Sequence, residues 1–166
     1  MVFMQHLVGR RMPDVDLEAT SGSPVNPSRI PGRAVIFCYP FTGRPGYDNP
    51  PNWDHIPGAH GSTPQALGYS ESYGQFRRLG VKLFGLSMLP VEWQQEFVTR
   101  NTLSFRLLSD STRAFQSRLG LPMFETGGQL YLQRITFILN DGAISAVRFP
   151  VSEPERDAAD VLAALS

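Results

Sequence analysis

The stretch Ala34-Val-Ile-Phe-Cys-Tyr-Pro40 decides the fold, because it is an unbroken apolar run closed by a proline. A strand that is covered on both faces needs no polar alternation, so this run predicts a buried central strand. A Gly/Pro-rich segment follows at residues 41–61, and a helical pattern then begins at Ser62-Thr-Pro-Gln65. The start of a helix carries unpaired N–H groups and a positive dipole end. Because α/β folds place their ligand sites at such strand-to-helix junctions, we expect the functional site there.

The charge balance excludes two classes of partner. Fifteen basic residues oppose fifteen acidic ones, so the formal net charge is zero. There is no electrostatic reason to expect nucleic acid or an anionic membrane surface as a partner. A length of 166 residues suits one domain over residues 1–166. A small molecule or a protein is therefore the expected kind of partner.

The N-terminus and the cysteine count bear on the compartment. Residues 1–12 place Arg10 and Arg11 after a short apolar part, which is the reverse of a secretory signal, and no apolar run reaches membrane-spanning length. Cys38 is the one cysteine of the chain, so no intramolecular disulfide is possible. Cys38 lies between two aromatic residues in the apolar run, and we interpret it as a small buried side chain rather than a displaced redox centre. Cytoplasm is the default expectation.

The remaining elements are predicted from hydrophobic period and turn residues. Residues 15–20 alternate and precede a turn, which is typical of one arm of an N-terminal β-hairpin. The expected strands are 15–20, 34–39, 81–87, 105–109, 131–139 and 143–151, and the expected helices are 63–79, 90–101, 111–119 and 153–165. This order predicts an α/β fold with a central mixed sheet and helices on both faces.

Several candidate site residues have a structural alternative. Ser62 is either a functional hydroxyl or part of a Ser-x-x-Gln capping box, and Thr63 is an alternative cap. Arg134 is expected within a strand of apolar neighbours, where an unpaired charge is unfavourable, so it either faces a polar pocket or forms a structural ion pair. Ser152-Glu-Pro-Glu155 also has capping-box spacing and is expected to start the last helix.

The 41–61 segment is long for a connection without regular structure, and such segments are usually functional or disordered. Tyr47 and Trp53 predict that it packs against the body of the protein. Arg44 is either an anion ligand or a solvated arginine. His55, His60 and Asp54 match no tight ligand spacing, so no metal site is predicted.

Six pieces of the sequence, in order, resemble the peroxiredoxins of the alkyl hydroperoxide reductase / bacterioferritin-comigratory type. The resemblance covers nearly the whole chain beyond residue 9. The pieces are Val35-Ile-Phe-Cys-Tyr-Pro40, Gly61-Ser-Thr-Pro-Gln65, Phe76-Arg-Arg-Leu-Gly-Val81, Gly85-Leu-Ser87, Leu107-Leu-Ser-Asp110 and Arg134-Ile-Thr-Phe-Ile-Leu-Asn-Asp-Gly142.

The resemblance implies a thioredoxin-like fold in which a cysteine on the first helical turn attacks peroxide, with no cofactor. The cysteine position falls on Ser62, and the helping proline and arginine match Pro40 and Arg134. The family's threonine position is Ala59, so Thr42 or Thr63 is expected to donate the hydrogen bond instead.

The resemblance also implies the partners: peroxide or a small anion in the pocket, and a thiol reductant. A second cysteine five residues after the first occurs in one subtype, and that position is Leu67 here.

A serine at position 62 changes the expected chemistry. Peroxide reduction requires a thiolate that becomes a sulfenic acid, and a hydroxyl forms no recyclable equivalent. Either a parent chain carries cysteine at position 62, or the nucleophile was lost naturally and the pocket kept. Three functions stay open: a thiol peroxidase whose parent has cysteine at 62, a repurposed enzyme that uses the same pocket for different chemistry, and a thioredoxin-fold binding or assembly protein. The last would use the pocket and a surface on the 41–61 segment, with Tyr47 and Trp53 exposed, as a homodimer or with another protein.

Overall fold

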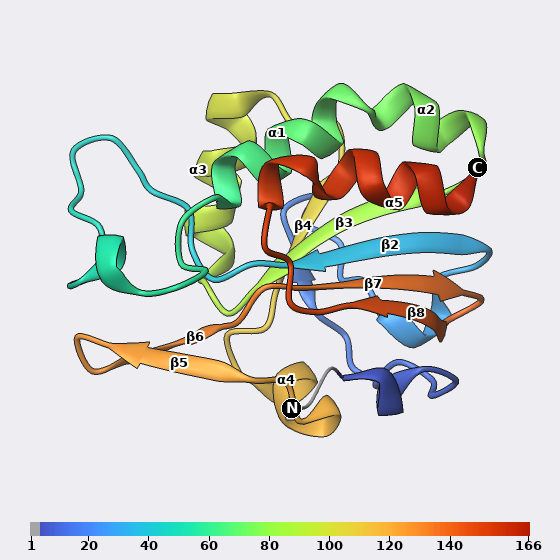
Figure 1. Cartoon of the computed structure of the whole chain (residues 1–166), viewed down its shortest axis with the longest axis horizontal. Helices are drawn as coiled ribbons and strands as arrows, with labels where there is room; N and C mark the ends of the chain where they lie inside the picture. The colour runs from blue at the N-terminus through green and yellow to red at the C-terminus, as the bar shows by residue number, and fades with distance from the viewer. Residues whose placement is uncertain (1–3) are drawn as a thin grey trace.

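The computed structural model describes residues 4–166 and has three layers, with a twisted sheet between helices (Figure 1). Residues 1–3, at the start of the N-terminal stretch considered above, lie outside the described part. The sheet has the strand order β1-β4-β3-β2-β7-β8. Its strands are β1 (Glu18–Ala19), β2 (Arg33–Cys38), β3 (Lys82–Ser87), β4 (Arg106–Ser109), β7 (Ile135–Asn140) and β8 (Ala143–Arg148).

The helices cover both faces of the sheet, as the sequence predicts. One face carries α1 (Ser62–Glu71), α2 (Tyr73–Arg78), α3 (Val91–Asn101) and α5 (Asp157–Leu165), and the other carries α4 (Ala114–Leu119) (Figure 1). Short 3-10 helices occur at η1 (Gln5–Leu7), η2 (Pro27–Arg29), η3 (Trp53–His55) and η4 (Pro154–Arg156). The described residues contain no helix that combines the length and apolar character needed to cross a bilayer.

Strand β2 is central because both of its faces are apolar. It pairs in parallel with β3 and antiparallel with β7, so the sheet is mixed. Val35 and Phe37 pack in the core beneath α1 and α5, whereas Ile36 and Cys38 pack in the opposite core beneath α4. All four side chains are fully buried. The apolar run at 34–39 therefore belongs to a strand covered on both sides, as predicted.

Gly85 on β3 is required by the packing on one face. A Cβ atom there would lie 2.6 Å from a Leu107 methyl carbon and 2.9 Å from the Phe37 ring. The Phe37 ring stacks on Tyr69 of α1, with centroids 4.5 Å apart, so it has little freedom to move away. The absent side chain at Gly85 thus allows α1 to lie close to the sheet.

The N-terminal hairpin is shorter than expected. Leu17 and Val25 form an isolated antiparallel bridge, and β1 pairs with β4 at the sheet edge. The edge pairing continues at Thr20, whose backbone N–H donates to the Leu107 carbonyl and whose hydroxyl accepts from the Leu107 N–H. Residues 18–20 are therefore held by β4, and Leu17 alone pairs with the expected hairpin partner.

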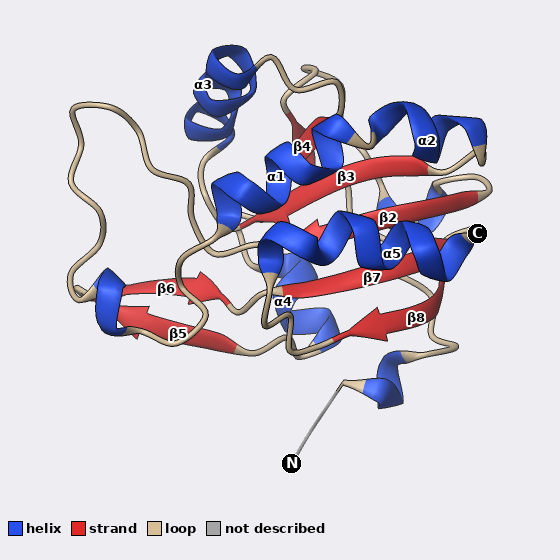
Figure 2. Ribbon diagram, turned by 45° about the horizontal axis from the view of Figure 1, so that its top comes forward, coloured by secondary structure: helices blue, strands red, loops and turns tan. Residues whose placement is uncertain are grey.

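The expected strand at 131–139 is interrupted at residues 133–134. Its first part belongs to a separate two-stranded hairpin of β5 (Met123–Thr126) and β6 (Gln129–Leu132). The hairpin extends from the body below the 41–61 segment, which is called the insert from here on (Figure 2). The hairpin was not predicted, because Gly127-Gly128 was not interpreted as a turn. The interruption places Arg134 in a connection, so its expected mid-strand position was wrong.

Both predicted capping boxes are wrong. Gly61, with φ of 112°, is the N-cap of α1, and no side chain caps that helix. Helix α5 begins after η4 with Arg156 as its N-cap, again without a side-chain cap. Asp110 does act as a cap at a distance, because its carboxylate accepts from the backbone N–H groups of Phe115 and Gln116.

Replacing Gly85 by alanine tests the packing of β3. We expect Gly85→Ala to lower the free energy of unfolding by about 1–3 kcal/mol, because the added methyl overpacks the core. Gly74→Ala is the matched control, since its Cβ would meet nothing closer than 3.9 Å. The control should raise stability by about 0.5 kcal/mol through reduced unfolded-state entropy. Urea denaturation followed by circular dichroism measures both, and equal stabilities for the two variants would contradict the packing described.

Candidate active site

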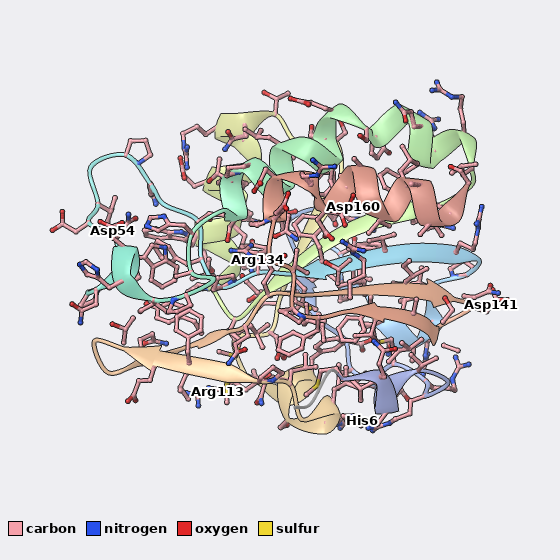
Figure 3. All side chains as sticks on the ribbon, in the orientation of Figure 1. His6, Asp54, Arg113, Arg134, Asp141 and Asp160 are labelled. Atoms are coloured by element: carbon pink, nitrogen blue, oxygen red, sulfur yellow. The ribbon has the colours of Figure 1, made fainter. Side chains whose placement is uncertain are left out.

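Ser62 and Arg134 meet where the start of α1 faces the connection between β6 and β7. Figure 3 shows Arg134 near the centre of the molecule, while Asp54 lies out on the insert. The Arg134 Nη1 donates to Ser62 Oγ at 3.2 Å. The two residues are 5% and 4% exposed, so this contact is inside the protein. The sheet and α1 thus bring together two residues that lie 72 positions apart in the chain.

The guanidinium of Arg134 also holds the end of the insert in place. Its Nη2 donates to the backbone carbonyls of Gly58, Ala59 and His60 at 3.3, 3.3 and 3.0 Å. Its Nη1 donates to Gln65 Oε1 at 2.6 Å. Every one of these acceptors is neutral. The arginine therefore fixes the segment leading into α1 without an ion pair of its own.

Asp157 lies behind Gln65 and is fully buried. Its Oδ2 accepts from Gln65 Nε2 at 3.1 Å, from Tyr69 Oη at 2.7 Å and from Thr136 Oγ1 at 2.7 Å. Its Oδ1 accepts from Arg148 Nε at 2.9 Å. Arg148 thus supplies the direct cationic partner of this carboxylate.

The charge of Arg134 therefore lies in the low-dielectric interior without a directly bonded carboxylate. Burial lowers the pKa of its guanidinium to about 10, and the more distant Asp157 carboxylate opposes that shift. Gln65 connects the two groups, accepting from Arg134 and donating to Asp157. Gln65 and Asp157 were missed as members of the site. Gln65 was visible in the Ser-Thr-Pro-Gln block, whereas nothing in the sequence links Asp157 to a residue 92 positions away.

Two buried polar groups of the described residues have no hydrogen-bond partner. They are the hydroxyl of Thr42, in a residue that is 2% exposed, and the Nε–H of Arg134. Buried donors and acceptors in folded proteins are nearly always paired, so such orphans call for a physical explanation. Both orphans belong to residues that the sequence selected as site candidates.

A cavity of about 460 Å³ opens beside Ser62. Ser62 and Thr63 line it from the start of α1, and Phe41 and Trp53 line it from the insert. Pro40 is elsewhere: it lines a separate cavity with Leu89 and Tyr131. The structure therefore brings Thr63 and Arg134 to Ser62 but does not place Pro40 against the same cavity.

Cys38 is fully buried in the core beneath α4. Burial raises the pKa of its thiol far above the ordinary value, and the nearby Asp110 carboxylate adds to the shift. The thiolate form required for nucleophilic attack is thereby disfavoured. The interpretation of Cys38 as a small buried side chain agrees with this environment.

The insert packs against the body through its three aromatic residues, Phe41, Tyr47 and Trp53. Trp53 is 5% exposed and contacts the rings of Phe41, Phe124 and Tyr131. The expectation that Trp53 is exposed on a contact surface was wrong, whereas Tyr47 is 57% exposed. Arg44 lies 5.0 Å from the centroid of the Tyr47 ring in a cation–π contact.

A mixed sheet flanked by helices, with a site at the start of the first long helix, defines a thioredoxin-like protein. The family profile described as Redoxin matches residues 7–165, and the chain belongs to this family. It is 27% identical over 157 residues to the chloroplastic peroxiredoxin Q of Sedum lineare, covering 93% of this chain and 75% of that protein. It is 28% identical over 145 residues to the putative peroxiredoxin bcp of Coxiella burnetii, covering 84% and 86%.

A solved structure supports the same fold. The crystal structure of peroxidoxin BcpB from Mycobacterium tuberculosis superimposes with a TM-score of 0.75 over 95% of each chain, at 23% identity. The predicted family resemblance and the thioredoxin-like fold are both confirmed, and the chain is peroxiredoxin-like.

Removing the orphaned hydroxyl tests its environment. We expect Thr42→Val to raise the free energy of unfolding by about 1 kcal/mol, because an unpaired buried hydroxyl is replaced by a methyl of similar shape. Thr136→Val is the matched control, since its hydroxyl donates to Asp157. The control should lose about 1–3 kcal/mol, because the carboxylate is left with one donor fewer. Thermal and urea unfolding measure both. A loss of stability in Thr42→Val equal to that in the control would show that the Thr42 hydroxyl is paired.

Proposed function

We propose that this chain is a redoxin that does not turn over peroxide and that binds a small anionic or strongly polar ligand at Ser62 and Arg134. The observation that carries the proposal is the chemistry of the helix start. A hydroxyl occupies the place where the peroxiredoxin resemblance implies the attacking sulfur, and the one thiol of the chain is fully buried at Cys38. Relatives named as peroxiredoxins share the fold, but their reaction needs a thiolate.

The surroundings of Ser62 suit an acceptor-rich ligand. The first turn of α1 has backbone N–H groups without intrahelical partners, and Arg134 adds a buried positive charge. Both act on the same point, because Arg134 Nη1 lies 3.2 Å from Ser62 Oγ. An anion or a peroxide-sized polar molecule would be stabilised by both the N–H groups and Arg134. It would not be consumed, because Ser62 supplies no thiolate to attack it.

The same surroundings would activate a thiol. A cysteine at position 62 would have its pKa lowered by the helix N-terminus and by Arg134. Its thiolate sulfur would attack one peroxide oxygen, so that the S–O bond forms as the O–O bond breaks and the other oxygen leaves as water or alcohol. The product is a sulfenic acid, which an external thiol reduces. A parent chain with cysteine at position 62 would therefore differ from this chain in the one side chain that peroxide reduction requires.

The Ser62→Cys variant tests this proposal directly. We expect the unmodified chain to consume no hydrogen peroxide with dithiothreitol as reductant. Ser62→Cys should form one sulfenic acid per chain, with its thiol pKa below the ordinary value of about 8.5. Ser23→Cys is the matched control, because it places a thiol at an exposed bend outside every helix.

Peroxide consumption and the mass of the oxidised protein are the measurements. The control should react at the slow rate of a free thiol. Catalytic consumption of peroxide by the unmodified chain would contradict the proposal, and equal rates for the two cysteine variants would show that the site does not activate a thiol.

A further inference from the structure

Arg134 lines a second cavity, separate from the one beside Ser62. This second cavity has a volume of about 440 Å³ and lies between the end of the insert and the connection from β8 to η4. Small-molecule sites generally have volumes of about 300–1,000 Å³. No cavity residue is shared with the one beside Ser62 except His60. Arg134 therefore lines this second cavity, while its Nη1 donates to Ser62, which lines the other one.

The walls of this second cavity are mainly apolar. Ile56 and Pro57 come from the insert, Phe124 from β5, and Phe149, Val151 and Pro154 from the connection before α5. The polar lining consists chiefly of Arg134, His60, Gln133 and Ser152. Among the described residues, no aspartate or glutamate lines the cavity. The combination is an apolar hollow with one buried cation in its wall and no acidic group.

The balance of charge around Arg134 is incomplete. Its five hydrogen-bond acceptors, which are Ser62, Gln65 and three backbone carbonyls, are neutral. The nearest carboxylate behind them, Asp157, is in direct contact with Arg148 instead. A buried charge without a counter-ion is unfavourable, and the remaining Nε–H has no acceptor among the described residues. An anionic group bound in the cavity, whose wall includes Arg134, would supply the missing counter-charge.

We propose that this second cavity binds an organic monocarboxylate, with its apolar body against the phenylalanine and proline walls and its carboxylate directed to Arg134. This inference goes beyond the proposed function, because it assigns a ligand to a cavity that includes Arg134 but not Ser62. A phosphate fits less well, because it brings two charges and several acceptors to a wall with one cation and few free donors. A neutral apolar molecule leaves the arginine uncompensated.

Isothermal titration calorimetry with octanoate, octan-1-ol and acetate tests the ligand class. Octanoate should bind with a stoichiometry of one. Octan-1-ol lacks the charge and acetate lacks the apolar body, so each should bind at least about tenfold more weakly. Absence of octanoate binding would overturn the inference, and so would equal affinity for octanoate and octan-1-ol.

A matched pair of variants identifies the cavity. Gln133→Glu places a carboxylate in the wall of the cavity, where its negative charge repels an anionic ligand. It should weaken octanoate binding about tenfold or more while leaving octan-1-ol unchanged. Gln129→Glu makes the same charge change at an exposed position of β6 that lines another cavity, and it should alter binding by less than about twofold.

Equal effects of the two variants would place octanoate elsewhere and overturn the inference. These measurements use no peroxide and no thiol. A failure here therefore leaves the result of the peroxide assay intact, and peroxide turnover by the unmodified chain would count against the proposed function alone.

Discussion

The buried guanidinium of Arg134 is the group on which the geometry of the site depends. It connects three parts of the chain that are distant in sequence: the end of the insert at Gly58–His60, the start of α1 at Ser62, and the β6–β7 connection that carries it. Removing one hydrogen-bond partner from a buried charge is more damaging than losing an exposed contact, because the desolvation penalty stays. The insert therefore has a defined end and α1 a defined beginning.

The support behind Arg134 is indirect. Gln65 accepts from the arginine and donates to Asp157, so an amide separates the two charges. Arg148 neutralises Asp157 on its other side. Arg134 keeps its charge available toward the second cavity, which it lines, because the Asp157 carboxylate is already paired with Arg148. A direct ion pair at this point would hold the same backbone but would attract an anionic ligand less strongly.

The sequence alone predicted most of the fold and the central part of the site. The apolar run at 34–39 could be interpreted because a strand buried on both faces needs no alternation, and Arg134 could be singled out because a lone charge among apolar residues requires compensation. The β5–β6 hairpin was missed because its Gly127-Gly128 turn lies between short strands with weak alternation. Asp157 was missed because its role depends on α5 lying beside α1, which is a tertiary contact without a local signal. The capping box at Ser62 was wrong because the hydroxyl accepts from Arg134, while Gly61 sets the helix start by its backbone conformation.

The NMR signal of the Arg134 guanidinium in the unmodified chain is the most direct test of the hydrogen bonds that hold the site together. Hydrogen bonds to Ser62, Gln65 and three carbonyls should slow rotation of the Nη groups and protect their protons from exchange with water. We expect separate, protected Nη–H resonances for Arg134, and faster exchange of the Nη1 protons in Gln65→Ala, which removes one of their two acceptors while the three carbonyls still hold Nη2. A single averaged signal in the unmodified chain, like that of exposed Arg113, would contradict this expectation.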